Sequence, residues 1–153
     1  MTCLDIQGEF GHLVSGTREG EVVLWCLEDN SLAQQLPSHS RQVNDLCFSP
    51  SGTQVISVGS DFFMKVFDLK TGTVIFCKNL GEEVLCVKWD GAMAVVGGGR
   101  GEVSVFDFLL GGKLVTRQRG HEGQVTSLTV SSDGGTIVTG GMDRRVIVWT
   151  PEQ

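Results

Sequence analysis

The stretch that decides the fold is residues 120–149, GHEGQVTSLTVSSDGGTIVTGGMDRRVIVW. Its first part alternates apolar and polar residues through Val125, Ser127, Leu128 and Val130. The turn-forming Asp133-Gly134-Gly135 follows, and then come two short runs rich in β-branched residues, 136–139 and 145–149. Short runs of this kind, separated by turn residues, predict three antiparallel strands.

The same pattern recurs along the whole chain. The first apolar residues of the opening strands are Met1, Val43, Val84 and Val125, at intervals of 42, 41 and 41 residues. The closing aromatic residues are Trp25, Phe67, Phe106 and Trp149. Six residues before each of them lie the turn residues Glu19, Asp61, Arg100 and Asp143, and four residues earlier still lie Ser15, Ser57, Val96 and Thr139. A fixed period near 41 residues indicates a repeat protein with four repeats.

These repeats resemble the WD-repeat family of β-propellers, whose repeats begin near Gly-His and end near Trp-Asp. The resemblance implies an all-β fold in which four blades of antiparallel strands form a partial, open propeller. We place it in one domain, residues 1–153, with repeats at about 1–27, 36–69, 80–108 and 119–150. Trp89-Asp90 looks like the dipeptide that ends a repeat, but it aligns with opening strands, so Trp89 is predicted to lie in the core.

The resemblance also implies a hydrogen-bonded tetrad of His, Ser or Thr, Asp and Trp in each blade. The last repeat has the complete set, His121, Thr139, Asp143 and Trp149. Partial sets are His39, Ser57 and Asp61 in the second repeat, and Ser15 and Trp25 in the first. The third repeat has Leu80, Val96, Arg100 and Phe106 at these positions, so we expect it to need no buried polar partner.

His121, Thr139 and Asp143 also have the residue types of a hydrolase triad. We prefer the structural interpretation, because these residues recur at equivalent repeat positions and no G-x-S-x-G motif accompanies them. The run 97–101 is rich in glycine, but it joins two predicted strands and opens no helix, so it lacks the context of a phosphate loop. We expect no enzyme activity, catalytic residue or cofactor.

Composition and charge restrict the partners. A net charge of −6 argues against general nucleic-acid binding, which uses clustered Lys and Arg. No run of 18 or more apolar residues predicts membrane insertion, and the acidic Asp5 and Glu9 do not fit a signal peptide. We expect an intracellular protein, cytoplasmic first, with a nuclear or a cytoskeletal or ciliary location left open.

Five cysteines, Cys3, Cys26, Cys47, Cys77 and Cys86, fall in predicted strands without a C-x-x-C pair. An odd number without framework spacing indicates buried or half-buried thiols, and neither disulfides nor a metal site.

The resemblance implies a scaffold that binds other proteins on the face carrying the His loops and the Asp turns. The residues predicted to lie on that face are Arg18, Arg41, Phe62, Glu82, Arg100, Glu122, Met142 and Arg144. Phe62 stands out, since Gly20, Gly101 and Arg144 hold the equivalent turn positions. The alternative is a substrate-receptor subunit of a ubiquitin ligase, but no repeat ends in the Trp-Asp-x-Arg that many such receptors share.

An open propeller leaves a blade face uncovered at each end. We therefore expect the chain to be the carboxyl-terminal part of a larger WD-repeat protein that does not close into a ring alone. It should aggregate, pair with a second copy into an eight-bladed ring, or fold together with the missing blades.

Overall fold

The computed structural model describes residues 2–7, 11–29, 31–36, 39–131 and 135–150. Met1, Glu9, Asp133 and Gly134, on which parts of the predictions depend, lie outside these ranges.

The described residues form four antiparallel sheets, numbered here in chain order. Sheet 1 contains β1 (Cys3–Gln7), β2 (His12–Gly16), β3 (Val22–Cys26) and β4 (Ser31–Leu36). Sheet 2 contains β5 (Val43–Phe48), β6 (Gln54–Gly59), β7 (Phe63–Asp68) and β8 (Thr73–Asn79). Sheet 3 contains β9 (Val84–Asp90), β10 (Met93–Gly98), β11 (Glu102–Asp107) and β12 (Lys113–Arg119). Sheet 4 contains β13 (Val125–Val130), β14 (Ile137–Gly141) and β15 (Val146–Trp149).

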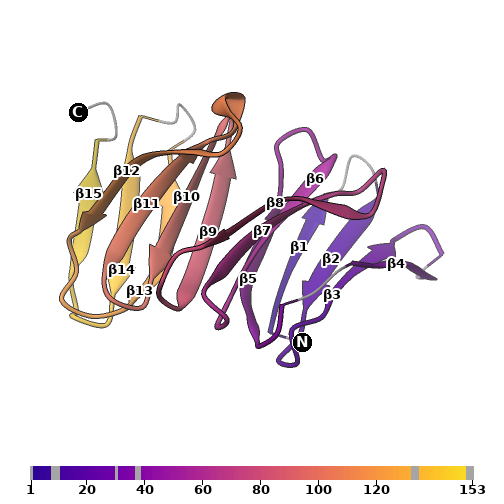
Figure 1. Ribbon diagram of the computed structural model, residues 1–153, viewed down its shortest axis with the longest axis horizontal. Helices are drawn as coiled ribbons and strands as arrows, with labels where there is room; N and C mark the ends of the chain where they lie inside the picture. Colours follow the sequence, from indigo (N-terminus) through magenta and orange to yellow (C-terminus); the bar gives the residue numbers. More distant parts are fainter. Residues whose placement is uncertain (1, 8–10, 30, 37–38, 132–134, 151–153) are drawn as a thin grey trace.

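In every sheet each strand pairs with the next one along the chain, so each sheet is a simple meander. The first strands lie side by side, since β1 contacts β5, β5 contacts β9 and β9 contacts β13. Figure 1 shows the sheets following one another from indigo at the right to yellow at the left, with sheets 1 and 4 at opposite ends. The prediction of four antiparallel blades in an open row is confirmed.

The residue patterns explain which strands lie inside. β6 and β10 are apolar nearly throughout and buried along most of their length, because a neighbouring sheet covers each face. β8 and β12 alternate between exposed and half-buried residues, as expected for outer strands with one face toward solvent. Three apolar clusters fill the spaces between sheets 1 and 2, 2 and 3, and 3 and 4.

One predicted strand ends early. The sequence pattern predicts the third strand of the third repeat over residues 103–108, but Phe108 begins a short 3₁₀ helix, Phe108–Leu110. Asp107 explains the change, because its carboxylate accepts a hydrogen bond from the Leu109 N–H at 2.9 Å and caps the turn. The Phe108 ring then packs at 4.8 Å, centroid to centroid, from the ring of Trp89, which is half-buried against the core as predicted.

All five cysteines are free and lie in strands. Cys47 and Cys86 are buried, and burial raises the pKa of the Cys86 thiol to about 12. Cys77 departs from the expectation of a buried or half-buried thiol. It is exposed, because it occupies a solvent-facing position of the outer strand β8.

Candidate functional site: the hydrogen-bonded tetrads and the loop surface beside them

In sheet 4 the tetrad side chains form one hydrogen-bonded chain. His121 Nδ1 lies 2.9 Å from Asp143 Oδ1, and His121 Nε2 lies 2.7 Å from Thr139 Oγ1. The Trp149 indole N–H donates to the same Thr139 oxygen at 2.9 Å. Because a carboxylate only accepts, Nδ1 carries the proton and Nε2 accepts from the threonine hydroxyl. The polar atoms of these four side chains therefore have hydrogen-bond partners in an interior of low dielectric.

The Asp143 carboxylate also ties two loops together. Its oxygens accept from the backbone N–H groups of Glu122 at 3.1 Å and Arg145 at 3.2 Å. Burial acts to raise the pKa of Asp143, but the hydrogen bonds from His121 and from these two N–H groups outweigh it and lower the pKa. The ionised Asp143 carboxylate, which accepts the hydrogen bonds from both loops, is therefore favoured.

This geometry does not suit a hydrolase triad. Thr139 is fully buried, and its hydroxyl is already engaged by both His121 and Trp149. A nucleophile must reach its substrate, and this oxygen has no open side. The chain of hydrogen bonds instead stiffens the sheet.

Sheet 2 repeats the arrangement without the indole. His39 Nδ1 lies 2.9 Å from Asp61 Oδ1, and His39 Nε2 lies 2.7 Å from Ser57 Oγ. Phe67 takes the place of the tryptophan and is fully buried. Sheet 1 has the serine and the tryptophan of the tetrad, and the Trp25 N–H donates to Ser15 Oγ at 2.9 Å.

Sheet 3 corrects the expectation that no buried polar group is needed there. Glu82 is only 5% exposed, and its Oε2 accepts from the Arg100 backbone N–H at 2.8 Å. A Cβ added at Gly98 would overlap this carboxylate, whereas at the equivalent Gly141 it would lie 2.8 Å from Asp143 Oδ1. The Glu82 carboxylate thus fills the place of the tetrad aspartate, but it reaches that place from the preceding loop.

Burial raises the pKa of Glu82, partly offset by the hydrogen bond from Arg100. Arg117 approaches the same group, with Nη2 3.9 Å from Glu82 Oε1, and also donates to the Leu80 carbonyl at 2.9 Å. Sequence reasoning missed this role because it compared only the four tetrad positions. A glutamate two residues after Leu80, in a repeat that lacks both His and Asp, was the available signal.

The other seven residues predicted on the partner-binding face are exposed. We name them the loop surface: Arg18, Arg41, Phe62, Arg100, Glu122, Met142 and Arg144. Glu82 is not part of this surface, contrary to the expectation, because its side chain is buried. Phe62 is 42% exposed and has a φ of 75°.

The positive φ at Phe62 belongs to a repeated turn. The equivalent residues Gly20, Gly101 and Arg144 have φ values of 99°, 87° and 65°. At Gly20 and Gly101 a Cβ would overlap the carbonyl oxygen of His39 or His121 in the next loop. The loop after Phe62 carries Leu80 in place of a histidine. An exposed phenylalanine in the left-handed region costs about 1–2 kcal/mol.

A polar cluster between sheets 2 and 3 also escaped sequence reasoning. Ser60 Oγ donates to Glu83 Oε1 at 2.6 Å, and Asn44 Nδ2 donates to the Val84 carbonyl at 2.8 Å. These residues lie next to the tetrad loops in sequence and join the two sheets beside the loop surface. No motif distinguishes them, since Ser60 and Glu83 are ordinary loop residues and Asn44 is an ordinary strand residue until the fold brings the sheets together.

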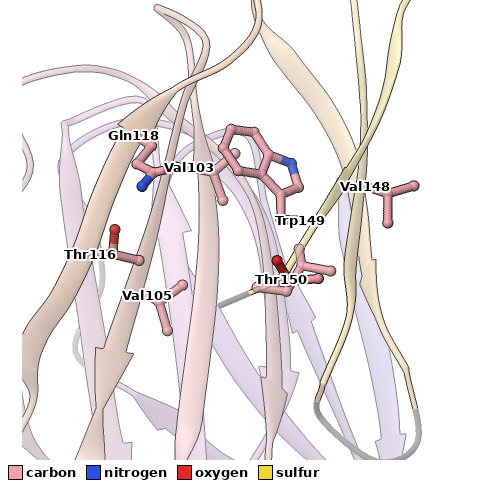
Figure 2. A pocket seen from close by; sticks show the side chains of 8 residues that line it. Val103, Val105, Thr116, Gln118, Val148, Trp149 and Thr150 are labelled. Carbon is pink, nitrogen blue, oxygen red and sulfur yellow. The ribbon is translucent and has the colours of Figure 1, made fainter. Parts of the chain in front are cut away.

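A groove of about 310 Å³ lies beside Trp149, between sheets 3 and 4. Figure 2 shows its walls: Val103, Val105, Thr116 and Gln118 line one side and the indole lies toward them, while Val148 and Thr150 line it from sheet 4. None of its lining residues is titratable. The groove therefore supplies no acid, base or metal ligand, and we assign it no chemistry.

No cluster of three or more His, Cys, Asp or Glu residues suited to a metal occurs among the described residues. Nor does that part of the chain contain a helix long and apolar enough to cross a membrane.

Sheet 2 should make stability depend on pH. Burial lowers the pKa of His39, although the hydrogen bond to Asp61 opposes the change. The neutral form of His39 is therefore favoured more in the folded state than in the unfolded state. The contribution of His39 to the free energy of unfolding is present above about pH 6.5 and is lost as the pH falls below it. We expect urea denaturation to give a lower free energy of unfolding at pH 5.5 than at pH 7.5.

His39→Gln is the control, because its amide forms hydrogen bonds and does not titrate. The loss between the two pH values should be smaller in this variant. An equal loss in both proteins would assign the pH dependence to other groups.

Comparison with known proteins identifies the repeats. The family model "WD domain, G-beta repeat" matches residues 30–68 and 112–150. The "U3 small nucleolar RNA-associated protein 15 homolog" of Xenopus laevis is 30% identical over 150 residues, which is 96% of this chain and 29% of the relative. The "p21-activated protein kinase-interacting protein 1-like" of Gallus gallus is 32% identical over 89 residues, covering 58% of this chain and 24% of the relative. The chain therefore spans less than a third of these relatives.

Solved structures of two computationally designed proteins, Ika4 and Ika8, each superpose on 97% of the chain with a TM-score of 0.87 and 25% identity. The matched region covers 89% of Ika4 and 45% of Ika8. The matched repeats, the four meander sheets and the tetrad geometry agree, and the chain belongs to the WD40 repeat family.

Proposed function

We propose that the chain is a non-enzymatic protein-interaction scaffold whose partner binds the loop surface. Phe62 carries the proposal. Glycine is the unstrained choice at this turn, yet the chain places a large aromatic residue there, 42% exposed and with φ at 75°. An exposed aromatic residue on a surface loop is typical of an interaction site, where a partner covers it.

The charge of the loop surface suggests the chemistry of the partner. Arg18, Arg41, Arg100 and Arg144 outnumber Glu122 and the exposed Glu19 that follows Arg18, although the whole chain carries a net charge of −6. Complementary charge favours encounter and register. We therefore propose an acidic protein segment with an apolar residue that covers Phe62.

The printed names of the relatives support a role in assemblies. One is named for association with a small nucleolar RNA, and the other for interaction with a protein kinase. The first name makes a nuclear, specifically nucleolar, location a second proposal beside the cytoplasmic one. The tetrads serve this function indirectly in our proposal, because they hold the loops that present the surface.

Phe62→Gly and Arg41→Glu test the proposal. Glycine removes the aromatic ring and also relieves the left-handed strain, so the melting temperature should be no lower than that of the parent chain. Each variant should lose most of the main partner in affinity capture from cell extract, read by quantitative mass spectrometry. Truncating a central interface residue costs about 2 kcal/mol or more, or roughly 30-fold in affinity.

Two control variants lie at the opposite end of the sheets. Leu109 is 83% exposed in the short 3₁₀ helix, and Lys70 is exposed in the turn between β7 and β8. Leu109→Gly matches Phe62→Gly, and Lys70→Glu matches Arg41→Glu. Capture should survive both controls. Loss in the controls together with retention in the loop-surface variants would place the binding site at the other end.

A further inference from the structure

The faces at the two ends of the row of sheets are open at repeat positions that are buried elsewhere. The third strands of sheets 1, 2 and 3 carry the pairs Val22 and Leu24, Met64 and Val66, and Val103 and Val105, all between 0% and 4% exposed. The equivalent residues of sheet 4, Val146 and Val148, are 72% and 64% exposed. Sequence does not explain this difference, because the residues are apolar in all four sheets. Within the described residues a following sheet covers this face of sheets 1 to 3, and none covers it in sheet 4.

Sheet 1 shows the converse on its outer face. Leu46, Val87 and Leu128, on the first strands of sheets 2 to 4, are 3%, 1% and 7% exposed. Their equivalent on β1, Leu4, is 48% exposed, since no sheet of the described residues packs on that face. The apolar cluster between sheets 1 and 2 shows how the two positions meet, since Val22 and Leu24 pack there with Leu46. Sheet 4 therefore exposes one half of the repeated contact and sheet 1 exposes the other half.

Polar contacts between first strands follow the same repeat. The Cys3 thiol donates to the Val43 carbonyl at 3.8 Å, Asp45 Oδ2 accepts from the Val87 N–H at 3.0 Å, and the Cys86 thiol donates to the Val125 carbonyl at 3.6 Å. Ser127 holds the equivalent position on β13 and is exposed. Its hydroxyl can donate or accept toward a further first strand.

We propose that the partner for these two faces is a second copy of this chain. The open face of sheet 4 docks on the open face of sheet 1 of the second copy, and the reciprocal contact closes a ring of eight sheets. Each chain carries both halves of the contact, and such a heterologous contact closes when the rotation per subunit permits. Eight sheets lie within the typical range for propellers, four to eight.

The match to a longer designed protein agrees with further sheets that continue the row. The chain superposes on 45% of the designed Ika8 protein with a TM-score of 0.87, so a protein about twice as long follows the same path over this part. This inference is independent of the proposed function, because the end faces do not include the residues that carry it, Phe62 and Arg41.

The test measures the mass of the purified 153-residue chain by light scattering and analytical ultracentrifugation over a range of concentrations. A discrete dimer is expected. Val146→Asp with Val148→Asp disables the face of sheet 4, and Leu4→Asp disables the face of sheet 1. Each variant should weaken the dimer by roughly 100-fold or more, because carboxylates would be buried without partners. Ile75→Asp is the matched control. Ile75 is 51% exposed on the outer strand β8, away from both faces, so this variant should remain dimeric.

A mixture of the two disabled variants makes the test specific. The intact sheet 4 face of one variant can dock on the intact sheet 1 face of the other, so an open dimer should reappear on mixing. Near-ultraviolet circular dichroism checks that each variant is folded. A monomeric parent chain at high concentration would overturn the proposal and leave the faces to the blades of another protein. Masses that rise without limit, or a dimer sensitive to only one of the two faces, would overturn it equally.

Discussion

Asp143→Ala should lower the free energy of unfolding by about 1–3 kcal/mol. The carboxylate, whose side chain is 7% exposed, accepts hydrogen bonds from His121 and from the backbone N–H groups of Glu122 and Arg145. Alanine leaves the buried His121 imidazole without its acceptor, whereas the N–H groups of Glu122 and Arg145 lie in exposed hydrogen bonds and can bind water instead. Urea denaturation at pH 7, followed by tryptophan fluorescence, measures the loss. Trp149→Phe should cost less, about 1 kcal/mol, because it removes one donor to Thr139 and keeps an aromatic ring.

Arg100→Ala is the control for Asp143→Ala. Arg100 occupies the same turn position in sheet 3, but its side chain is exposed and the backbone N–H that binds Glu82 remains in alanine. A surface substitution of this kind changes stability by no more than about 0.5 kcal/mol. Equal losses in Arg100→Ala and Asp143→Ala would contradict the structural role that we propose for the tetrad.

The repeat interval made most of the fold predictable. Because a strand position that recurs every 41 or 42 residues must face the same neighbour in each sheet, aligning four closing aromatics located the strands to within one or two residues. The prediction at Phe108 was wrong because the Asp107 carboxylate caps a 3₁₀ turn there. The alternation of apolar and polar residues does not reveal such a cap.

The candidate site was less predictable, because a tetrad position can be filled from elsewhere in the chain. The sequence of the third repeat lacks both His and Asp, yet a carboxylate still sits over Gly98, supplied by Glu82 from the loop. The special backbone at Phe62 was likewise hidden. The alignment showed that glycine holds two of the equivalent positions, but only the structure shows φ at 75° and a following loop without histidine.

At Gly20 and Gly101 the turn glycine lies close to the carbonyl oxygen of the histidine in the next loop. The substitution with the largest expected effect, Gly101→Ala, tests this contact. Gly101 has a φ of 87°, and a Cβ there would overlap the His121 carbonyl oxygen and lie 2.9 Å from the Gly123 carbonyl oxygen. Left-handed strain costs about 1–2 kcal/mol, and overpacking a tight site costs about 1–3 kcal/mol. We expect a loss of about 2–5 kcal/mol in urea denaturation, because the loop that must move also carries His121 of the tetrad.

Gly81→Ala separates the two causes. Gly81 has a similar φ of 77°, but nothing lies within 4 Å of the added Cβ, so only the strain of about 1–2 kcal/mol applies. The difference between the two variants then measures the contact with the histidine loop. If Gly101→Ala costs no more than Gly81→Ala, the loop gives way freely. In that case the left-handed backbone alone explains glycine at this turn. The close contact between Gly101 and the loop that carries His121 would then not be needed for stability.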